Sequence, residues 1–275
     1  MVRILVTSQH DIASLTILDV LTQEFDFRET GDVFDGAPVF SCGPHFRLIT
    51  SSRDLISTNH LESQFPADIY IFCSRHRAES KRPALLVHST GNLGPEALFG
   101  GSPYSLSVSC ASLVSVALRT LRVEKEALGL DDFDVTLEAT HHGPTNMDTP
   151  LLFVELGSDE DYWVHREGAR AVASAAMACL NAPFERESFI GFGGTHYASK
   201  FNKIVLEKDM RIGHIAPKYA MDEIPESVVR QMVSRSKETV RRAVIDWKGT
   251  NQEQRNHLLP ILDDIGIELI RDKDL

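Results

Sequence analysis

The sequence lacks the marks of a secreted or membrane-spanning protein. Its cysteines are widely separated, form no C-x-x-C pair and lie mostly in apolar runs, so we interpret them as buried thiols, which suit a reducing cytoplasm: Cys42, Cys73, Cys110 and Cys179. The N-terminus has one basic residue and too short an apolar run for a signal peptide, and no segment reaches the roughly 18 apolar residues that cross a bilayer. We therefore expect a cytoplasmic protein without a membrane segment.

Several common catalytic and nucleotide-binding motifs are also absent. No G-x-G-x-x-G follows the first apolar run, and no G-x-x-x-x-G-K-[S/T] occurs, which disfavours dinucleotide and P-loop binding. The chain has no G-x-S-x-G elbow and no candidate nucleophilic cysteine. Acyl-enzyme chemistry is therefore not indicated.

An excess of positive charge is missing too. The formal net charge is -11, which argues against indiscriminate binding to nucleic acid, since that affinity comes mainly from lysine and arginine. Basic residues still cluster at 74–82, 199–211 and 230–242. Acidic residues are interspersed in these clusters, and each taken alone is typical of a solvated face.

What the sequence does contain is a regular alternation of strands and helices. Of its 275 residues 43% are hydrophobic, enough for a sizeable core. Apolar runs predict strands over 2–8, 67–73, 83–88, 133–140, 150–157 and 188–194, and helical spacing predicts helices over 11–25, 105–128 and 159–181. From about residue 222 we expect mainly helix, over 225–247 and 251–266, before a short strand at 267–270. This order predicts a single domain over 1–275 of the α/β class, with three layers: a mostly parallel sheet and helices on both of its faces.

Polar motifs follow four of the predicted strands. They are "SRHRAE" at 74–79, "HSTGN" at 88–92, "EATHHGPT" at 138–145 and "GFGGTHYASK" at 191–200. Taken alone, each has a structural explanation: a core histidine, a tight turn or a solvated loop. Because ligands of such sheets bind outside the carboxyl ends of the strands, we expect the four loops to meet at one edge.

The residue types in these loops favour metal-assisted hydrolysis. His76 and Glu79 have the H-x-x-E spacing that lets an imidazole and a carboxylate share one zinc ion, and further histidines follow at 88, 141, 142 and 196. Gly91 gives "HSTGN" the freedom to turn its backbone N–H groups toward an anion. The predicted reaction is attack of water on a carbonyl.

The ordered motifs "SRH", "HSTGN", "EATHHGPT" and "GFGGTHYA", after the opening "ILVTSQHDIAS", resemble the archaeal and plant type of D-aminoacyl-tRNA deacylase over essentially the whole chain. The resemblance implies hydrolysis of the ester between a D-amino acid and the terminal ribose of tRNA, a step of translation quality control and D-amino acid detoxification. It also implies a zinc requirement and a phosphorylase/hydrolase-like fold related to peptidyl-tRNA hydrolase. One motif departs from the family: we expect His-Thr-Pro-Gly-Asn where residues 88–92 read His-Ser-Thr-Gly-Asn.

Resemblance and residues together suggest roles for the loops. Zn²⁺ would be held by a subset of His76, Glu79, His141, His142 and His196. Glu138 is the candidate general base, and His88 and Asn92 are the other candidate catalytic residues. The acceptor end of D-aminoacyl-tRNA would meet a larger set: Arg75, Arg77, Ser89, Thr90, Gly91, Thr140, Gly194, Thr195, Tyr197 and Lys200.

Two alternatives remain open at this point. A zinc metallo-exopeptidase or amidohydrolase would use the same histidines, and a non-catalytic RNA-binding module would depend on the basic residues 235–242 instead. Few Tyr and Trp residues are present for base stacking. Adjacent histidines on an extended segment also point to opposite faces, so His141 and His142 can share a metal only if the backbone turns there. A monomer with no obligate protein partner is expected.

Overall fold

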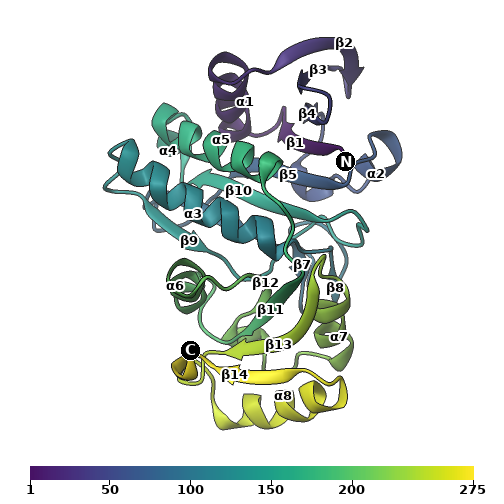
Figure 1. Cartoon of the computed structure of the whole chain (residues 1–275), viewed down its shortest axis with the longest axis vertical. Coiled ribbons are helices and arrows are strands. Elements are labelled where there is room, and N and C mark those ends of the chain that lie inside the picture. The colour runs from purple at the N-terminus through teal and green to yellow at the C-terminus, as the bar shows by residue number, and fades with distance from the viewer. The chain divides into compact units, whose positions relative to one another are not determined.

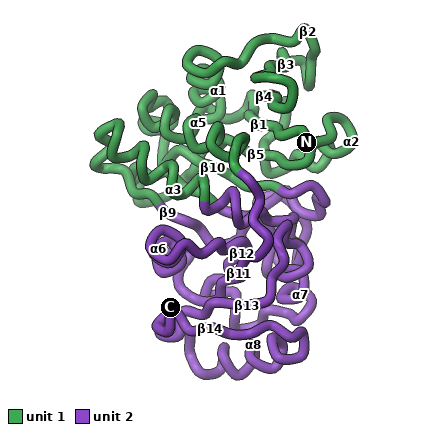
Figure 2. The backbone as a smooth tube through the Cα atoms, in the orientation of Figure 1, with its two compact units in different colours: residues 1–87, 116–135, 151–182 green, residues 88–115, 136–150, 183–275 purple.

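The computed structural model describes all 275 residues and divides into two compact units (Figure 2). Unit 1 comprises residues 1–87, 116–135 and 151–182, and unit 2 comprises residues 88–115, 136–150 and 183–275. The chain therefore leaves and re-enters unit 1 several times. The prediction of a single domain stays a prediction.

Unit 1 is built on an eight-stranded sheet in the order β2-β3-β4-β1-β5-β10-β6-β9 (Figure 1). Strand β1 is parallel to β4 and β5, and β5 is parallel to β10, whereas β2, β3 and β4 pair antiparallel. The strands are β1 Arg3–Ser8, β2 Arg28–Phe34, β3 Ala37–Cys42, β4 Phe46–Ser51, β5 Ile69–Arg75, β6 Ala84–His88, β9 Asp134–Leu137 and β10 Leu151–Gly157. Strands β1, β5 and β10 are buried along almost their whole length, as expected of parallel strands covered on both faces.

Helices α1 (Ile12–Glu24) and α5 (Arg166–Asn181) pack on each other and on strands of this sheet. Asp11 starts α1 by accepting a hydrogen bond from the Ser14 N–H at 3.0 Å, a standard N-cap. The alanine-rich face of α5 lets it approach α1 closely. The other helices of this unit are α2 Leu61–Gln64, α4 Glu160–Trp163 and most of α3 Ala111–Ala127, with the short 3₁₀ turn η1 at Leu55–Ser57.

Unit 2 contains a four-stranded parallel sheet in the order β12-β11-β13-β14. Its helices α7 and α8 contribute Val228, Val229, Met232, Leu258 and Leu262 to a buried apolar cluster with the strands. The elements are β7 Gly91–Asn92, β8 Ser105–Leu106, β11 Glu187–Phe192, α6 Ser199–Lys208, β12 Ile212–Ala216, α7 Glu226–Ser234, β13 Thr239–Ile245, α8 Gln252–Asp264 and β14 Glu268–Arg271, with 3₁₀ turns η2 Lys218–Ala220 and η3 Asp272–Asp274.

The sequence-based predictions of the strands and of α1 and α8 are confirmed within a few residues. The continuous helix expected over 225–247 is wrong: α7 ends at Ser234, and β13 follows because Thr239–Ile245 pairs with β11 and β14 in the sheet. The helix expected over 159–181 is two helices, since His165 caps α5. Elements α6 and β12 were not predicted, and the α/β fold has two main sheets in place of one.

Buried thiols are confirmed for Cys73, Cys110 and Cys179, and no cysteine forms a disulfide. Burial raises the pKa of Cys179 to about 12. Cys42 is only partly buried. None of the helices has both the length and the hydropathy of a membrane-spanning helix.

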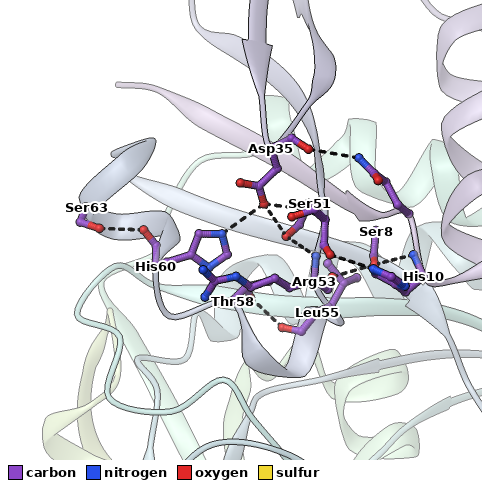
Figure 3. A network of polar contacts seen from close by, with 11 residues as sticks. Ser8, His10, Asp35, Ser51, Arg53, Leu55, Thr58, His60 and Ser63 are labelled. Carbon is purple, nitrogen blue, oxygen red and sulfur yellow. Dashed lines mark hydrogen bonds and ion pairs between the residues drawn. The ribbon is translucent and has the colours of Figure 1, made fainter.

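A polar network in unit 1 follows the end of β4 (Figure 3). Asp35, in the turn between β2 and β3, accepts hydrogen bonds at 3.0 Å from the Ser51 hydroxyl and the Ser52 N–H, and its Oδ2 lies 3.3 Å from His60 Nε2. Burial raises the pKa of Asp35, but these three donors outweigh it and lower the pKa. The network ties the β2–β3 turn to the segment after β4.

Candidate active site

Four histidine rings lie together in unit 2. The ring centroid of His141 is 4.2 Å from that of His88, 4.4 Å from that of His142 and 4.6 Å from that of His196. His88 is also 4.7 Å from His142. His88 is 1% exposed, whereas the other three are partly exposed. We call these four residues the histidine cluster.

The backbone turns between the two adjacent histidines. His142 has φ +43°, in the left-handed region that few non-glycine residues adopt, so the alternation of an extended chain is broken there. His141 itself forms an isolated parallel bridge with Thr90. Both His141 and His142 can therefore face His88, which is the condition that the sequence left open.

Backbone carbonyls fix the orientation of three of these rings. The Nδ1 atom of His141 lies 2.8 Å from the Ala139 carbonyl oxygen, and that of His142 lies 2.6 Å from the Gly143 oxygen. His88 Nδ1 lies 3.2 Å from the Ser89 oxygen. A carbonyl only accepts, so each Nδ1 carries the proton and each Nε2 carries the lone pair that a metal or a proton can use.

The buried carboxylate of Glu138 pairs with the partly exposed ring of His196, one member of the cluster. His196 Nε2 lies 3.1 Å from a Glu138 carboxylate oxygen, and its Nδ1 lies 3.1 Å from the Tyr219 hydroxyl. The Glu138 side chain is 0% exposed, and that of His196 is 35% exposed. The pair can pass a proton between buried carboxylate and open surface. The Tyr219 ring is largely exposed, yet burial of its hydroxyl and the charge of Glu138 raise its pKa.

The donor set fits a zinc ion. The ligand atoms of His88, His141 and His142 lie within 4.8 Å of one another, and so do those of Glu138, His141 and His196. Imidazole nitrogen and carboxylate oxygen are ligands that zinc takes, and the Nδ1–carbonyl bonds are the outer contacts that usually orient ligating histidines. His141 belongs to both sets.

Side chains of the "HSTGN" loop form hydrogen bonds to the segments around the cluster. The Ser89 hydroxyl donates to the Gly213 oxygen at 3.2 Å, and the Thr90 hydroxyl donates to the Pro144 oxygen at 2.8 Å. The Asn92 amide donates to the carbonyls of Gly100 and Ser102 at 2.9 and 3.2 Å. In this structure these side chains therefore position loops around the cluster.

Gly91 joins this loop to the histidines by close packing. Its N–H donates to the carbonyls of His141 and His142 at 3.2 and 2.9 Å. A Cβ atom at Gly91 would overlap the side chain of Leu106 and lie 3.1 Å from the Leu106 Cα. A side chain at position 91 would therefore have to displace the Leu106 side chain of β8.

Thr140 faces β12. Its N–H donates to the Ile215 oxygen at 2.9 Å, and its hydroxyl accepts from the Ile215 N–H at 3.0 Å. The hydroxyl also lies 3.3 Å from His214 Nδ1, while His214 Nε2 lies 3.0 Å from the Arg235 oxygen. Complete burial lowers the pKa of His214 to about 4, so this ring is neutral at neutral pH.

The loop after β11 brings His196 to Glu138. The Ala139 N–H donates to the His196 oxygen at 2.8 Å, and Glu138 and Tyr197 form an antiparallel bridge. Gly194 has φ +77° and accepts a hydrogen bond from the Lys218 N–H. The rest of the predicted binding set lies at or near the surface: Thr195, Tyr197 and Lys200.

Lys200 is engaged with an acid. Its Nζ lies 3.0 Å from Asp272, and the hydrogen bond with that carboxylate raises the pKa of Lys200. The four polar loops do not all follow strands of one sheet, although the sequence predicts that they do. The loop that contains His196 follows β11, which pairs with β12 and β13 in the sheet of unit 2 and not with β5, β6 or β9.

The remaining predicted residues lie in unit 1. His76 is 7% exposed, and its Nδ1 lies 3.5 Å from Glu155, which also accepts from the Ser74 hydroxyl at 2.7 Å. Glu79 is exposed in the turn after His76, so the carboxylate beside His76 is Glu155, and the expected H-x-x-E pair does not form. The two arginines of this motif lie over the Trp163 ring, and Arg77 also pairs with Glu160 at 3.0 Å.

Sequence reasoning missed Glu155, His214 and Tyr219. A signal existed for Glu155, because a carboxylate inside the apolar run "LLFVELG" must have a buried partner. His214 lies in the five-residue strand "IGHIA", which was too short to stand out. No local pattern marks Tyr219.

Together, fold and site define an α/β protein with a histidine–carboxylate centre that fits a metal ion. The sequence model of the family described as D-aminoacyl-tRNA deacylase matches residues 63–270. The D-aminoacyl-tRNA deacylase of Pyrococcus horikoshii is 35% identical, covering 98% of this chain and 100% of the relative, and that of Methanocaldococcus jannaschii is 31% identical, covering 96% and 97%. The chain therefore belongs to the D-aminoacyl-tRNA deacylase family.

The fold is shared with a solved structure as well. A crystal structure of a conserved protein of unknown function superposes with a TM-score of 0.90 at 29% identity, covering 99% of this chain and 95% of the other. The family resemblance seen in the motifs is thus confirmed over the full length.

Proposed function

We propose that this chain hydrolyses the ester bond between a D-amino acid and the terminal ribose of tRNA, releasing free D-amino acid and tRNA, and that the reaction takes place at the histidine cluster. Family membership supports the substrate class. The observation that carries the location is the set of three imidazoles with fixed Nδ1–H tautomers beside the Glu138–His196 pair. The activity would remove D-amino acids from translation.

Zinc is proposed as the cofactor, held by His88, His141 and His142 through their Nε2 atoms. Support comes from the placement of one ring nitrogen of each histidine within 4.8 Å of those of the other two, and from the carbonyls that orient the rings through Nδ1. A bound zinc ion would polarise the ester carbonyl and lower the pKa of a bound water toward about 7. In this arrangement His196, predicted from the sequence as a ligand, has both ring nitrogens engaged with Glu138 and Tyr219 and is better suited to moving protons.

Proton transfer is assigned to Glu138 and His196. The pair takes one proton from the attacking water, whose oxygen bonds to the ester carbon. The same pair returns that proton to the ribose oxygen as the ester bond breaks, so that a carboxylic acid and a ribose hydroxyl result. Burial of Glu138 keeps bulk water from competing for this proton.

Binding of the acceptor end is proposed for exposed cationic and aromatic groups near the motifs. Arg77 is 72% exposed and Lys200 43% exposed, so their present acid partners can be exchanged for phosphates at small cost. Tyr197, 39% exposed, offers a ring for stacking. Ser89, Thr90, Gly91, Asn92 and Thr140 would act indirectly, by holding the histidine loops.

We also propose the phosphorylase/hydrolase-like fold related to peptidyl-tRNA hydrolase that the resemblance implies, and a cytoplasmic monomer. The contact between His76 and Glu155 supports His76 as a further candidate metal ligand, with Glu155 in place of Glu79.

The test is release of amino acid from D- and L-tyrosyl-tRNA by the purified chain, with chelator and with zinc restored. The proposal expects hydrolysis of the D-ester alone, lost with chelator and regained with zinc. Hydrolysis of D-tyrosine amide in place of the tRNA ester would favour the amidohydrolase alternative. Activity toward neither compound would contradict the proposed function.

A further inference from the structure

A pocket of about 270 Å³ lies in unit 2 next to the histidine cluster. Its lining combines apolar and aromatic side chains with two acids and contains no basic residue: Leu93, Pro95, Tyr104, Tyr219, Asp222 and Glu223 are among its members. The volume is near the lower end for ligand pockets, so it suits one small group and not a stretch of nucleic acid.

Two elements of the site form walls of this pocket. Tyr219 lines it with its side chain while its hydroxyl lies 3.1 Å from His196 Nδ1. Leu93 to Pro95 continue directly from Asn92, the end of the "HSTGN" loop that holds His141 and His142. Tyr219 therefore contacts His196 of the histidine cluster and also lines the pocket.

Tyr104 is held in the pocket wall in a costly conformation. Its φ is +52°, in the left-handed region that disfavours bulky side chains, and it is fixed there by its N–H donating to the Gly94 oxygen and its carbonyl accepting from Gln231. Such strain persists where the surrounding structure fixes the residue, and it often marks a ligand-binding position. The ring is 40% exposed in spite of its size.

We propose that this pocket binds the aminoacyl group of the substrate and so determines which D-amino acids are accepted. This inference rests on the proposed function. The two groups that flank the scissile ester differ in charge: the nucleotide side carries phosphates, and the aminoacyl side carries an ammonium. Asp222 and Glu223 repel the first and attract the second. The Tyr104 ring and Leu93 then contact the amino acid side chain.

The two acids play different parts. Asp222 also accepts a hydrogen bond from Gln254 at 2.8 Å, which anchors it to α8. Glu223 is exposed, as Asp222 is. Glu223 is therefore the residue to change, because its replacement alters the charge of the pocket without removing the contact to α8.

The experiment compares kcat/KM for D-tyrosyl, D-alanyl and D-aspartyl esters carried on the same tRNA body, so that only the amino acid varies. Tyr104→Ala should lower the ratio of D-tyrosyl to D-alanyl hydrolysis roughly fivefold, and Tyr104→Phe should keep it, because the ring contact is retained. Glu223→Lys should raise the ratio of D-aspartyl to D-tyrosyl hydrolysis about fivefold by removing a repulsion. Glu253→Lys makes the same charge change in α8, outside the pocket lining, and should leave both ratios unchanged.

The outcomes separate the proposal from the function on which it rests. An equal loss for all three esters in Tyr104→Ala would assign the pocket to the terminal adenosine and overturn the aminoacyl assignment. Unchanged ratios in both Tyr104→Ala and Glu223→Lys would also overturn it, while wild-type hydrolysis of D-esters would still support the deacylase function. Glu223→Lys, on an exposed side chain, keeps the test valid if Tyr104→Ala fails to fold.

Discussion

Two histidine–carboxylate arrangements in this chain serve different ends. In unit 1, Asp35 is surrounded by donors from Ser51, Ser52 and His60, and these contacts join the β2–β3 turn to the end of β4 and to the segment after it (Figure 3). In unit 2, Glu138 meets His196, whose other nitrogen meets a partly exposed tyrosine, and three further imidazoles present their Nε2 atoms nearby.

The two arrangements differ in which atoms of the carboxylate and the imidazole rings are already hydrogen-bonded within the chain. Donors from the chain lower the pKa of Asp35, so it is a fixed anion that holds the β2–β3 turn. Three rings of the histidine cluster, those of His88, His141 and His142, are oriented by a contact at Nδ1, which directs the other nitrogen toward chemistry. A carboxylate–imidazole contact by itself therefore says little about function. The contact made by the other ring nitrogen distinguishes a structural arrangement from a catalytic one.

The largest expected effect follows from removing the charge of Glu138. Glu138→Gln keeps the side-chain volume but ends proton transfer, so D-tyrosyl-tRNA hydrolysis should fall about 100-fold or more. The free energy of unfolding should change little by comparison. Steady-state hydrolysis and urea unfolding, measured on the same preparation, check both statements. Hydrolysis within threefold of wild type would assign the proton transfer elsewhere.

The next effect concerns close packing at Gly91. Gly91→Ala places a methyl group against Leu106, and this overpacking should cost about 3 kcal/mol of stability. Because Gly91 also bonds to the carbonyls of His141 and His142, hydrolysis should fall as well. Gly94→Ala is the stability control, since its Cβ would meet no atom within 4 Å. Equal stability of the two variants would refute the packing argument.

His214 gives a pH dependence of stability. Its pKa in the folded chain is lowered to about 4 from the model-compound value of 6.5, so the unfolded chain binds more protons between these values. Stability from this residue is complete above pH 6.5 and is lost as the pH falls toward 4, by about 2 kcal/mol between pH 7 and pH 5. Urea unfolding at both pH values should show a smaller loss for His214→Gln than for wild type. The same loss in both proteins would show that other groups cause it.

The smallest effect belongs to unit 1. Asp35→Asn removes a charged acceptor from three donors and should cost about 1.5 kcal/mol of stability. Hydrolysis per folded molecule should stay at the wild-type level, in contrast to Glu138→Gln. A 100-fold loss of hydrolysis in Asp35→Asn would end the distinction between the two arrangements.

Much of this organisation could be predicted from the sequence, and the failures have physical causes. Long apolar runs such as "IYIFC" identify buried strands whatever their partners. The sequence predicts helix at β13 because "TVRRAVI" follows a helical stretch. Pairing with β11 makes this segment a strand. Helix α6 was hidden by its lysines, although Phe201, Ile204 and Val205 have helical spacing and are buried.

For the site, the residue types and motifs could be predicted, but not their contacts. The "THHG" motif identified His141 and His142, yet their common orientation depends on φ at His142, which no residue pattern fixes. Pairing of Glu138 with His196, and of His76 with Glu155, joins residues far apart in sequence. Such pairs follow from the tertiary fold alone.

The most direct test uses His141, because this residue belongs to two of the possible ligand sets. Zinc content and hydrolysis of D-tyrosyl-tRNA are measured together for wild type and His141→Ala, with Asp35→Asn as the control. We expect His141→Ala to lose bound zinc and at least 100-fold in hydrolysis, and the control to keep both. Full zinc content with full hydrolysis in His141→Ala would contradict the assignment of the chemistry to the histidine cluster.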